Sequence, residues 1–189
     1  TAVEVRKGDI LKINNSSTGS RCYISIKGII ELDEVLGSKS YYPQISHSSI
    51  IEKGDELKFE ANNSRPNYKL INQKFELNKN LKVFKGPEFN CLNKGSINQI
   101  INQEFSIGIN NRMAYNLKEK IQAGVTSIIS SAVMPGTVQL TPSGQMIILH
   151  RDCQTTGGYP RILQLDEKSL NNLAQLRIGD KIKFEIVTL

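Results

Sequence analysis

A short phrase built on Gly-Asp occurs three times and sets the strongest limit on what this chain can fold into. In each copy the Gly-Asp pair is followed by residues that alternate between apolar and polar side chains. Gly-Asp favours a turn, and alternation with a period of two is typical of a strand with one buried face. The spacing of the copies is too irregular for a solenoid. We therefore expect similar β units at residues 7–13, 53–59 and 178–184.

Apolar and β-branched runs between turn signals predict further short strands. They lie at residues 22–26, 81–84, 105–109, 128–129, 137–140, 146–149 and 162–165. A helix is expected over 96–101 with Ser96 as its N-cap, and another over 168–175 with Asp166 or Glu167 near its start. Many short strands and few helices indicate a mostly β barrel or sandwich with small capping helices.

Length and composition are those of an ordinary globular protein. The 189 residues allow one or two domains, and the polar, Asn-rich stretch 61–80 is the expected junction. No apolar run approaches the roughly 20 residues that a membrane-spanning helix needs. The net charge is +6, but the lysines are dispersed and aromatic residues make up only 6%. We interpret the charge as a solvated surface, or as an attraction for anionic substrates, and expect neither nucleic acid nor a membrane as partner.

Cysteine and histidine are scarce. The three cysteines, Cys22, Cys91 and Cys153, have no CxxC spacing, which favours a reducing compartment, and we expect a cytoplasmic protein. The two histidines, His47 and His150, provide no zinc-ligand spacing, so no metal site is expected. His150 and Cys153 are three residues apart, which places them on opposite faces of a strand and disfavours a local Cys–His nucleophile. No P-loop, nucleophile elbow or dinucleotide fingerprint is present.

Residues 152–160 are the first candidate for a functional site because polar side chains follow directly on an apolar strand. If the extended conformation continues, Asp152, Gln154 and Thr156 share one face. Gly157-Gly158 would then allow a positive φ or a close approach of the backbone to another group. Polar groups on a strand end beside two glycines predict a small-molecule site.

Arg112 is the second candidate because it follows an expected strand in a polar cluster. A guanidinium there could clamp a carboxylate or phosphate in bidentate fashion, or it could tie a loop to backbone carbonyls. The pattern leaves both possibilities open. It also leaves open whether Asp152 is a general base or an ion-pair partner of Arg112.

The run Asp152-x-Gln154-Thr155-Thr156-Gly157-Gly158-Tyr159-Pro160 resembles the signature of the allophanate hydrolase subunit 2 family. That family includes the C subunit of 5-oxoprolinase (KipA) and the carboxyltransferase part of urea carboxylase. Other motifs of the family occur in the same order, at residues 35–40, 111–113, 135–144 and 173–180. The sequence departs from the family pattern at Ala114, usually glycine, at Lys39, usually arginine, and at residues 46–51, usually glycine-rich. It also begins inside the pattern, so we expect a fragment of a longer protein.

The resemblance implies cyclophilin-like β-barrel domains, mostly β with a few short helices, and a functional cleft between them. Residues 1–65 would be the remainder of an N-terminal barrel and the start of a linker. Residues 66–80 would be the linker, and residues 81–189 a C-terminal barrel.

The resemblance also implies a function, as the C subunit of a bacterial ATP-dependent 5-oxoprolinase. This enzyme opens the lactam of 5-oxoproline to glutamate. The chain would be a hydrolase subunit that is inactive without its partners, which are the A subunit of the enzyme together with a KipI-like B subunit. ATP would be used by the complex.

The site residues follow from the same resemblance. Asp152 and Arg112 would be catalytic. Hydrogen bonds to a carbonyl or oxyanion would come from Gln154, Thr155 and Thr156. Substrate binding would be completed by Gly157, Gly158, Tyr159 and Asn111.

Two alternatives remain open. One is a biotin-dependent carboxyltransferase acting on urea or a similar amide, with biotin carried elsewhere because the chain has no A-M-K-M sequence. The other is a non-catalytic KipA-like regulator that binds a KipI-like kinase inhibitor.

Overall fold

The computed structural model describes residues 3–16, 19–42, 44–46, 51–62 and 77–188. Its contacts divide the chain into two compact units. Unit 1 comprises Thr1–Gly8 and Cys22–Gln73, and unit 2 comprises Asp9–Arg21 and Lys74–Leu189. Most of the linker expected at 66–80 lies outside the described residues, so the expected domain boundaries stay a prediction.

Unit 1 holds one described sheet of two antiparallel strands, β1 (Gly28–Ile30) and β2 (Phe59–Ala61). The strand expected at 22–26 is wrong, because those residues form no ladder and Ile24 is 57% exposed. Alternation alone does not make a strand where the described residues provide no partner for its backbone groups. The Gly-Asp copy at 53–59 yields a strand only from its last residue, Phe59.

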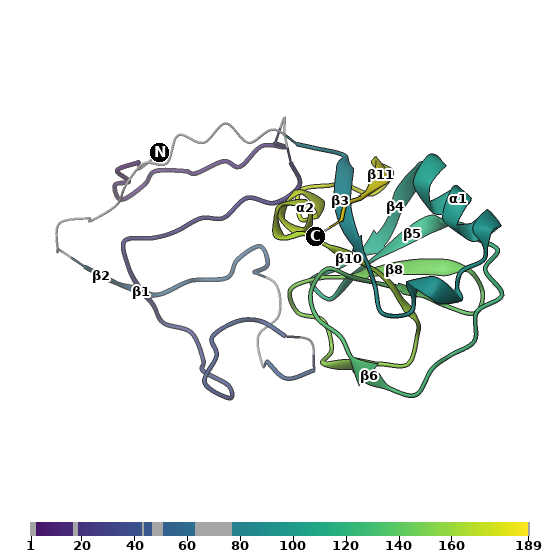
Figure 1. The fold of residues 1–189 in the computed structure, drawn as a ribbon. Helices are drawn as coiled ribbons and strands as arrows, with labels where there is room; N and C mark the ends of the chain where they lie inside the picture. The colour runs from purple at the N-terminus through teal and green to yellow at the C-terminus, as the bar shows by residue number, and fades with distance from the viewer. Residues whose placement is uncertain (1–2, 17–18, 43, 47–50, 63–76, 189) are drawn as a thin grey trace. The chain divides into compact units, whose positions relative to one another are not determined.

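Unit 2 is built on a closed barrel of seven strands in the order β10-β3-β11-β4-β5-β8-β7 (Figure 1). All neighbours are antiparallel except β3 and β11. The strands are β3 (Asn80–Lys85), β4 (Phe105–Asn110), β5 (Ala114–Lys120), β7 (Thr137–Leu140), β8 (Gln145–Leu149), β10 (Arg161–Leu165) and β11 (Lys181–Ile186). Closure leaves no open edge in this sheet.

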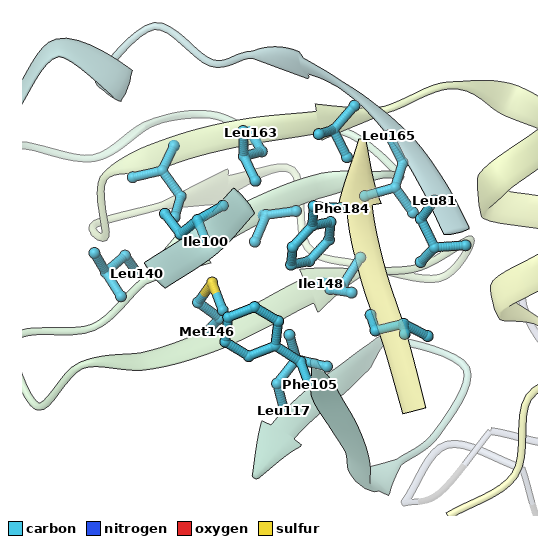
Figure 2. Packing of buried hydrophobic residues seen from close by; sticks show 14 of the residues in the cluster. Leu81, Ile100, Phe105, Leu117, Leu140, Met146, Ile148, Leu163, Leu165 and Phe184 are labelled. Carbon is cyan, nitrogen blue, oxygen red and sulfur yellow. The ribbon is translucent and has the colours of Figure 1, made fainter. Parts of the chain in front are cut away.

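The apolar residues of the alternating strands point inward and form the barrel core. In β3, Leu81 and Val83 are fully buried while Asn80 and Lys82 are exposed. Figure 2 shows inward-pointing aliphatic side chains around Phe105 and Phe184, whose ring centroids are 5.6 Å apart. The third Gly-Asp copy supplies β11 as expected. The first copy does not, because residues 10–13 form no described strand.

Two helices and a 3-10 turn accompany the barrel: η1 (Phe89–Cys91), α1 (Lys94–Asn102) and α2 (Glu167–Leu173). Asp166 caps α2 by accepting the Ser169 amide at 2.7 Å, which confirms the expected start. The expected cap of α1 is wrong. Asn93 is the cap, and the Ser96 hydroxyl is turned to the Gln122 carbonyl at 2.8 Å.

A small two-stranded sheet joins β6 (Ser131–Ala132) to β9 (Thr156–Gly157). The strand expected at 128–129 is therefore displaced by a few residues, because pairing with β9 selects the segment that forms the ladder. The expectation of a mostly β barrel with few helices is confirmed.

Candidate functional site

A pocket of about 270 Å³ lies within unit 2. Its walls come from the facing ends of β4 and β5, from β7 and β8, and from the loop after β8. The lining residues are Ile109, Asn110, Asn111, Met113, Ala114, Asn116, Gln139, Ile147, Leu149, Gln154, Gly157, Gly158 and Tyr159. The pocket thus combines an apolar floor with a few polar groups, as small-molecule sites commonly do.

Apart from the phenol of Tyr159, the polar side chains of this lining are carboxamides, and none of the lining residues is charged. Hydrogen bonds fix how several of them present their atoms. The amide nitrogens of Asn116 and Gln139 donate to the carbonyls of Ile109, at 3.1 Å, and Tyr159, at 3.4 Å. Asn111 is held the other way, because its Oδ1 accepts the amides of Met113 and Ala114 at 2.8 and 3.0 Å.

After these hydrogen bonds are made, the lining still has both donor and acceptor atoms without a partner among the described residues. Among the described residues no donor engages the side-chain oxygens of Asn116 and Gln139, and no acceptor engages the Asn111 amide nitrogen. Gln139 is only 2% exposed, yet its oxygen is not enclosed. A carboxamide oxygen accepts and a carboxamide nitrogen donates, so the pocket suits a neutral group that carries both an N–H and a C=O.

Arg112 and Asp152 are brought together as an ion pair, which is one of the two roles that the sequence left open for Asp152. Arg112 Nε lies 2.5 Å from Asp152 Oδ2, and the Asp152 amide donates to the Arg112 carbonyl at 3.0 Å. The two side chains are 57% and 29% exposed. They do not line the pocket; they form an ion pair beside it, at the base of the loop that contributes Gln154.

The loop after β8 does not continue as a strand, because Arg151 and Asp152 form a turn. Asp152, Gln154 and Thr156 therefore do not share a strand face. Thr155 lies outside the lining and its carbonyl accepts the Val133 amide at 3.0 Å. Thr156 also lies outside, in β9, where it pairs with Ala132.

Gly157 and Gly158 lie where the backbone of the loop comes close to other groups. Neither has a positive φ. The Gly157 backbone is packed directly onto the Gln139 amide, because a Cβ on Gly157 would lie 2.4 Å from Gln139 Nε2 and the Gln139 side chain would have to move to admit it. A Cβ on Gly158 would make an ordinary contact, 3.5 Å from the Ile128 carbonyl.

Arg161 and Glu88 form an ion pair that contacts β6, the strand that pairs with β9. Arg161 donates to Glu88 through Nε at 2.9 Å and Nη2 at 2.7 Å, and through Nη1 to the Ala132 carbonyl at 2.8 Å. The hydrogen bond from Arg161 is the main reason that the pKa of Glu88 is lowered, against the opposing effect of burial. Ala132 pairs with Thr156, so the ion pair supports the pocket loop through β6.

His150 and Cys153 form no nucleophilic pair. Burial raises the pKa of the Cys153 thiol, which disfavours the reactive thiolate. The imidazole packs on Tyr115, with ring centroids 5.3 Å apart, and its ring nitrogens have no hydrogen-bond partner among the described residues. His47 lies outside the described residues. Within the described part of the chain, no cluster of three or more His, Cys, Asp or Glu could hold a metal ion, and no helix is long and apolar enough to cross a membrane.

Sequence reasoning placed Gln154, Gly157, Gly158, Tyr159 and Asn111 in the site, and the structure brings these five to one pocket. It missed Gln139 and Asn116. Gln139 carried a signal, because it is a polar residue in the middle of the apolar strand 137–140. Asn116 carried none, since the strand that contains it was not expected.

A family model described as carboxyltransferase domain, subdomain A and B, matches residues 1–186, and the chain belongs to this family.

The chain is also similar to two named proteins and to a solved structure. The chain is 31% identical over 198 residues to the C subunit of 5-oxoprolinase from Haemophilus influenzae. The matched region covers 98% of this chain and 62% of that protein. It is 29% identical over 188 residues to the Escherichia coli protein of the same name, covering 95% and 60%. The chain thus spans about three fifths of their length. The Kluyveromyces lactis urea carboxylase structure shares the fold, with TM-score 0.72 and 20% identity over 91% of this chain and 18% of that one.

Proposed function

We propose that this chain is part of the C subunit of an ATP-dependent 5-oxoprolinase, which converts 5-oxoproline to glutamate in the cytoplasm. It would act together with the A subunit and with a KipI-like B subunit. The names of the two relatives support the assignment to such a complex. The observation that carries the proposal is the uncharged, carboxamide-lined pocket.

The lactam amide of 5-oxoproline fits this chemistry because it carries one N–H donor and one C=O acceptor, and the carboxylate on the ring would lie toward Arg112 at the edge of the pocket. The side-chain oxygens of Gln139 and Asn116 would accept the lactam N–H. The Asn111 amide nitrogen would donate to the lactam oxygen, and this bond would strengthen as charge develops on that oxygen during ring opening. Apolar contacts with Ile147 and Leu149 would exclude water from the ring.

Arg112 and Asp152 would act at the edge of the pocket. Arg112 would stabilise negative charge on a carboxylate or on a phosphorylated intermediate. Asp152 would orient the guanidinium and, as a general base, accept a proton from the water that attacks the lactam carbonyl carbon, and this proton would pass to the ring nitrogen as the C–N bond breaks. ATP is used by the complex, and the chain alone would be inactive.

The test is reconstitution of the full-length protein with the A and B subunits, followed by measurement of ATP-dependent glutamate release from 5-oxoproline. Activity is expected only with all three subunits, and Arg112→Ala and Asp152→Ala are each expected to reduce it strongly. Tight assembly with the B subunit without glutamate release would contradict the proposal and favour the regulator.

The family description and the urea carboxylase fold favour one second candidate, a biotin-dependent carboxyltransferase. The same carboxamides could bind the ureido group of biotin or of urea. Carboxylation of urea in the presence of a biotin carboxylase and a biotinylated carrier would support this candidate. Glutamate release in a reaction free of biotin would contradict it.

A further inference from the structure

The segment Gly19–Arg21 belongs to unit 2, where it is hydrogen-bonded to residues that follow the end of α2. Gln175 Oε1 accepts the amides of Ser20 and Arg21, at 3.0 and 3.1 Å. Arg177 donates through Nε to the Gly19 carbonyl at 3.1 Å. Gly19 has φ +74°, and a Cβ there would lie 2.5 Å from Gln175 Oε1. The positive φ favours glycine, and a Cβ would displace the Gln175 carboxamide from the Ser20 and Arg21 amides.

With its backbone held in this way, Arg21 reaches β5 of the barrel with its side chain. Arg21 Nη2 donates to the Tyr115 hydroxyl at 3.1 Å, and the guanidinium lies 6.0 Å from the centre of the Tyr115 ring. Tyr115 is fully buried in β5, directly after the pocket-lining turn that ends at Ala114. Its ring contacts that of His150 on the neighbouring strand end.

His150 links the two loops that bound the pocket. Its amide donates to the Met113 carbonyl at 2.7 Å, and its carbonyl accepts the Cys153 amide at 3.0 Å. The imidazole is 3% exposed, and neither ring nitrogen makes a hydrogen bond of normal geometry among the described residues, although the Leu170 backbone lies close enough to favour the protonated ring. A buried polar ring without a partner is unfavourable, so other contacts must hold it in place.

The charges around His150 favour a neutral ring. Burial lowers the pKa of His150, and the positive charges of Arg21 and Arg151 lower it further. The Leu170 backbone and the Asp152 carboxylate act in the opposite direction. Arg21 therefore acts on this ring in two ways, by orienting Tyr115 against it and by repelling a proton.

We propose that Arg21 is a positioning residue for the pocket: fastened by Gln175, it fixes Tyr115 and through it His150, from which both pocket loops are held. The inference rests on the proposed function and deepens it, since it adds a residue that controls the same site without touching the substrate.

Hydrogen exchange of backbone amides in the full-length protein tests this inference independently of any ligand. Arg21→Gln and Tyr115→Phe are each expected to speed exchange at His150 and Asp152 about tenfold. The amides of Gly86 and Val187, which bond within the barrel, should stay within about twofold. Arg6→Gln, which changes an exposed arginine of unit 1, is the matched control and should alter none of these rates.

Unchanged exchange at His150 and Asp152, or a parallel increase at all of these amides, would overturn the inference. If Arg21→Gln does not fold, Tyr115→Phe decides, because it keeps the buried ring and removes only the hydroxyl.

A second readout is the pKa of His150, followed by NMR with its imidazole signal identified by its loss in His150→Phe. It should rise in Arg21→Gln, and no change would count against the inference. In the reconstituted enzyme, KM for 5-oxoproline should rise about tenfold in Tyr115→Phe, with kcat within about twofold. If the wild type does not use 5-oxoproline, the proposed function fails while the exchange result still decides the role of Arg21.

Discussion

The side-chain nitrogen of Gln139 lies 3.4 Å from the carbonyl oxygen of Tyr159, so a residue of the barrel wall holds the loop that closes the pocket. Gly157 packs on the same side chain. Gln139 therefore anchors the loop through its nitrogen, and in the proposed function its oxygen would accept a hydrogen bond from the ligand. A strand of the barrel thus positions the loop residues of the site, which favours precise binding.

Gln139→Leu keeps the approximate size of the side chain and removes both functions. We expect KM for 5-oxoproline to rise about tenfold, the worth of roughly one hydrogen bond. Steady-state glutamate release by the reconstituted complex measures this. Gln122→Leu, a change of the same type at an exposed position, is the control. Equal KM values for the two variants would contradict the role of Gln139.

Arg112→Ala and Asp152→Asn test the ion pair beside the pocket. Because both side chains are partly exposed, each change should alter the free energy of unfolding by no more than about 1 kcal/mol. The rate of glutamate release should nevertheless fall about a hundredfold or more. Lys79→Ala, which breaks the exposed Lys79–Asp180 pair, is the control for the loss of a surface ion pair. A rate close to the wild-type value in either variant would remove these residues from the catalytic site.

Glu88→Gln tests the brace behind the pocket loop. The variant should lose about 1–2 kcal/mol of stability at pH 7, because glutamine carries no charge to pair with Arg161 and its side-chain oxygen can replace only one of the two carboxylate oxygens that accept from the guanidinium. The pKa of Glu88 is below its ordinary value of 4.5, so this stabilisation is complete above that pH and is lost as the pH falls through the lower folded value. Urea unfolding at pH 7 and pH 3 should therefore show a smaller pH effect in the variant. An equal pH effect in both proteins would exclude the brace.

His150 gives a second pH dependence. Its pKa is lowered in the folded protein, so its contribution to stability is complete above the unfolded pKa of about 6.5 and declines as the pH falls below it. His150→Phe removes this group and keeps an aromatic ring beside Tyr115. Stability measured at pH 7.5 and pH 5.5 should differ less in the variant than in the wild type. A steeper loss in the variant would show that the ring is stabilised by protonation.

The barrel was predictable from the sequence where a local signal agreed with tertiary packing. Leu81 and Val83 alternate with polar residues and are buried, and Asp166 is the cap that its position before α2 predicts. The same signal failed at residues 22–26, where alternation is present and no described strand pairs with it. Local pattern indicates which face would be buried, but hydrogen-bond partners decide whether a strand forms.

The site was predictable to the extent that it lies on one continuous loop. Gln154 and Tyr159 could be found because polar residues and glycines follow a strand. Gln139 and Asn116 come from two strands that the barrel brings near the loop, and no sequence spacing encodes that meeting. The contact of Arg112 with Asp152 was one of two open alternatives, and only the turn at residues 151–152 decides it.

Gly157→Ala tests most directly whether this pocket is the substrate site. The added Cβ would lie 2.4 Å from Gln139 Nε2, so the Gln139 carboxamide would have to leave its position in the pocket wall, whereas Gly95→Ala adds the same methyl group in α1. The decisive measurement is kcat/KM for 5-oxoproline in the complex with the A and B subunits. We predict a loss of at least about a hundredfold in Gly157→Ala, as expected when a site is displaced by about 1 Å, and wild-type activity in Gly95→Ala. Wild-type kcat/KM in Gly157→Ala would contradict the assignment of the pocket.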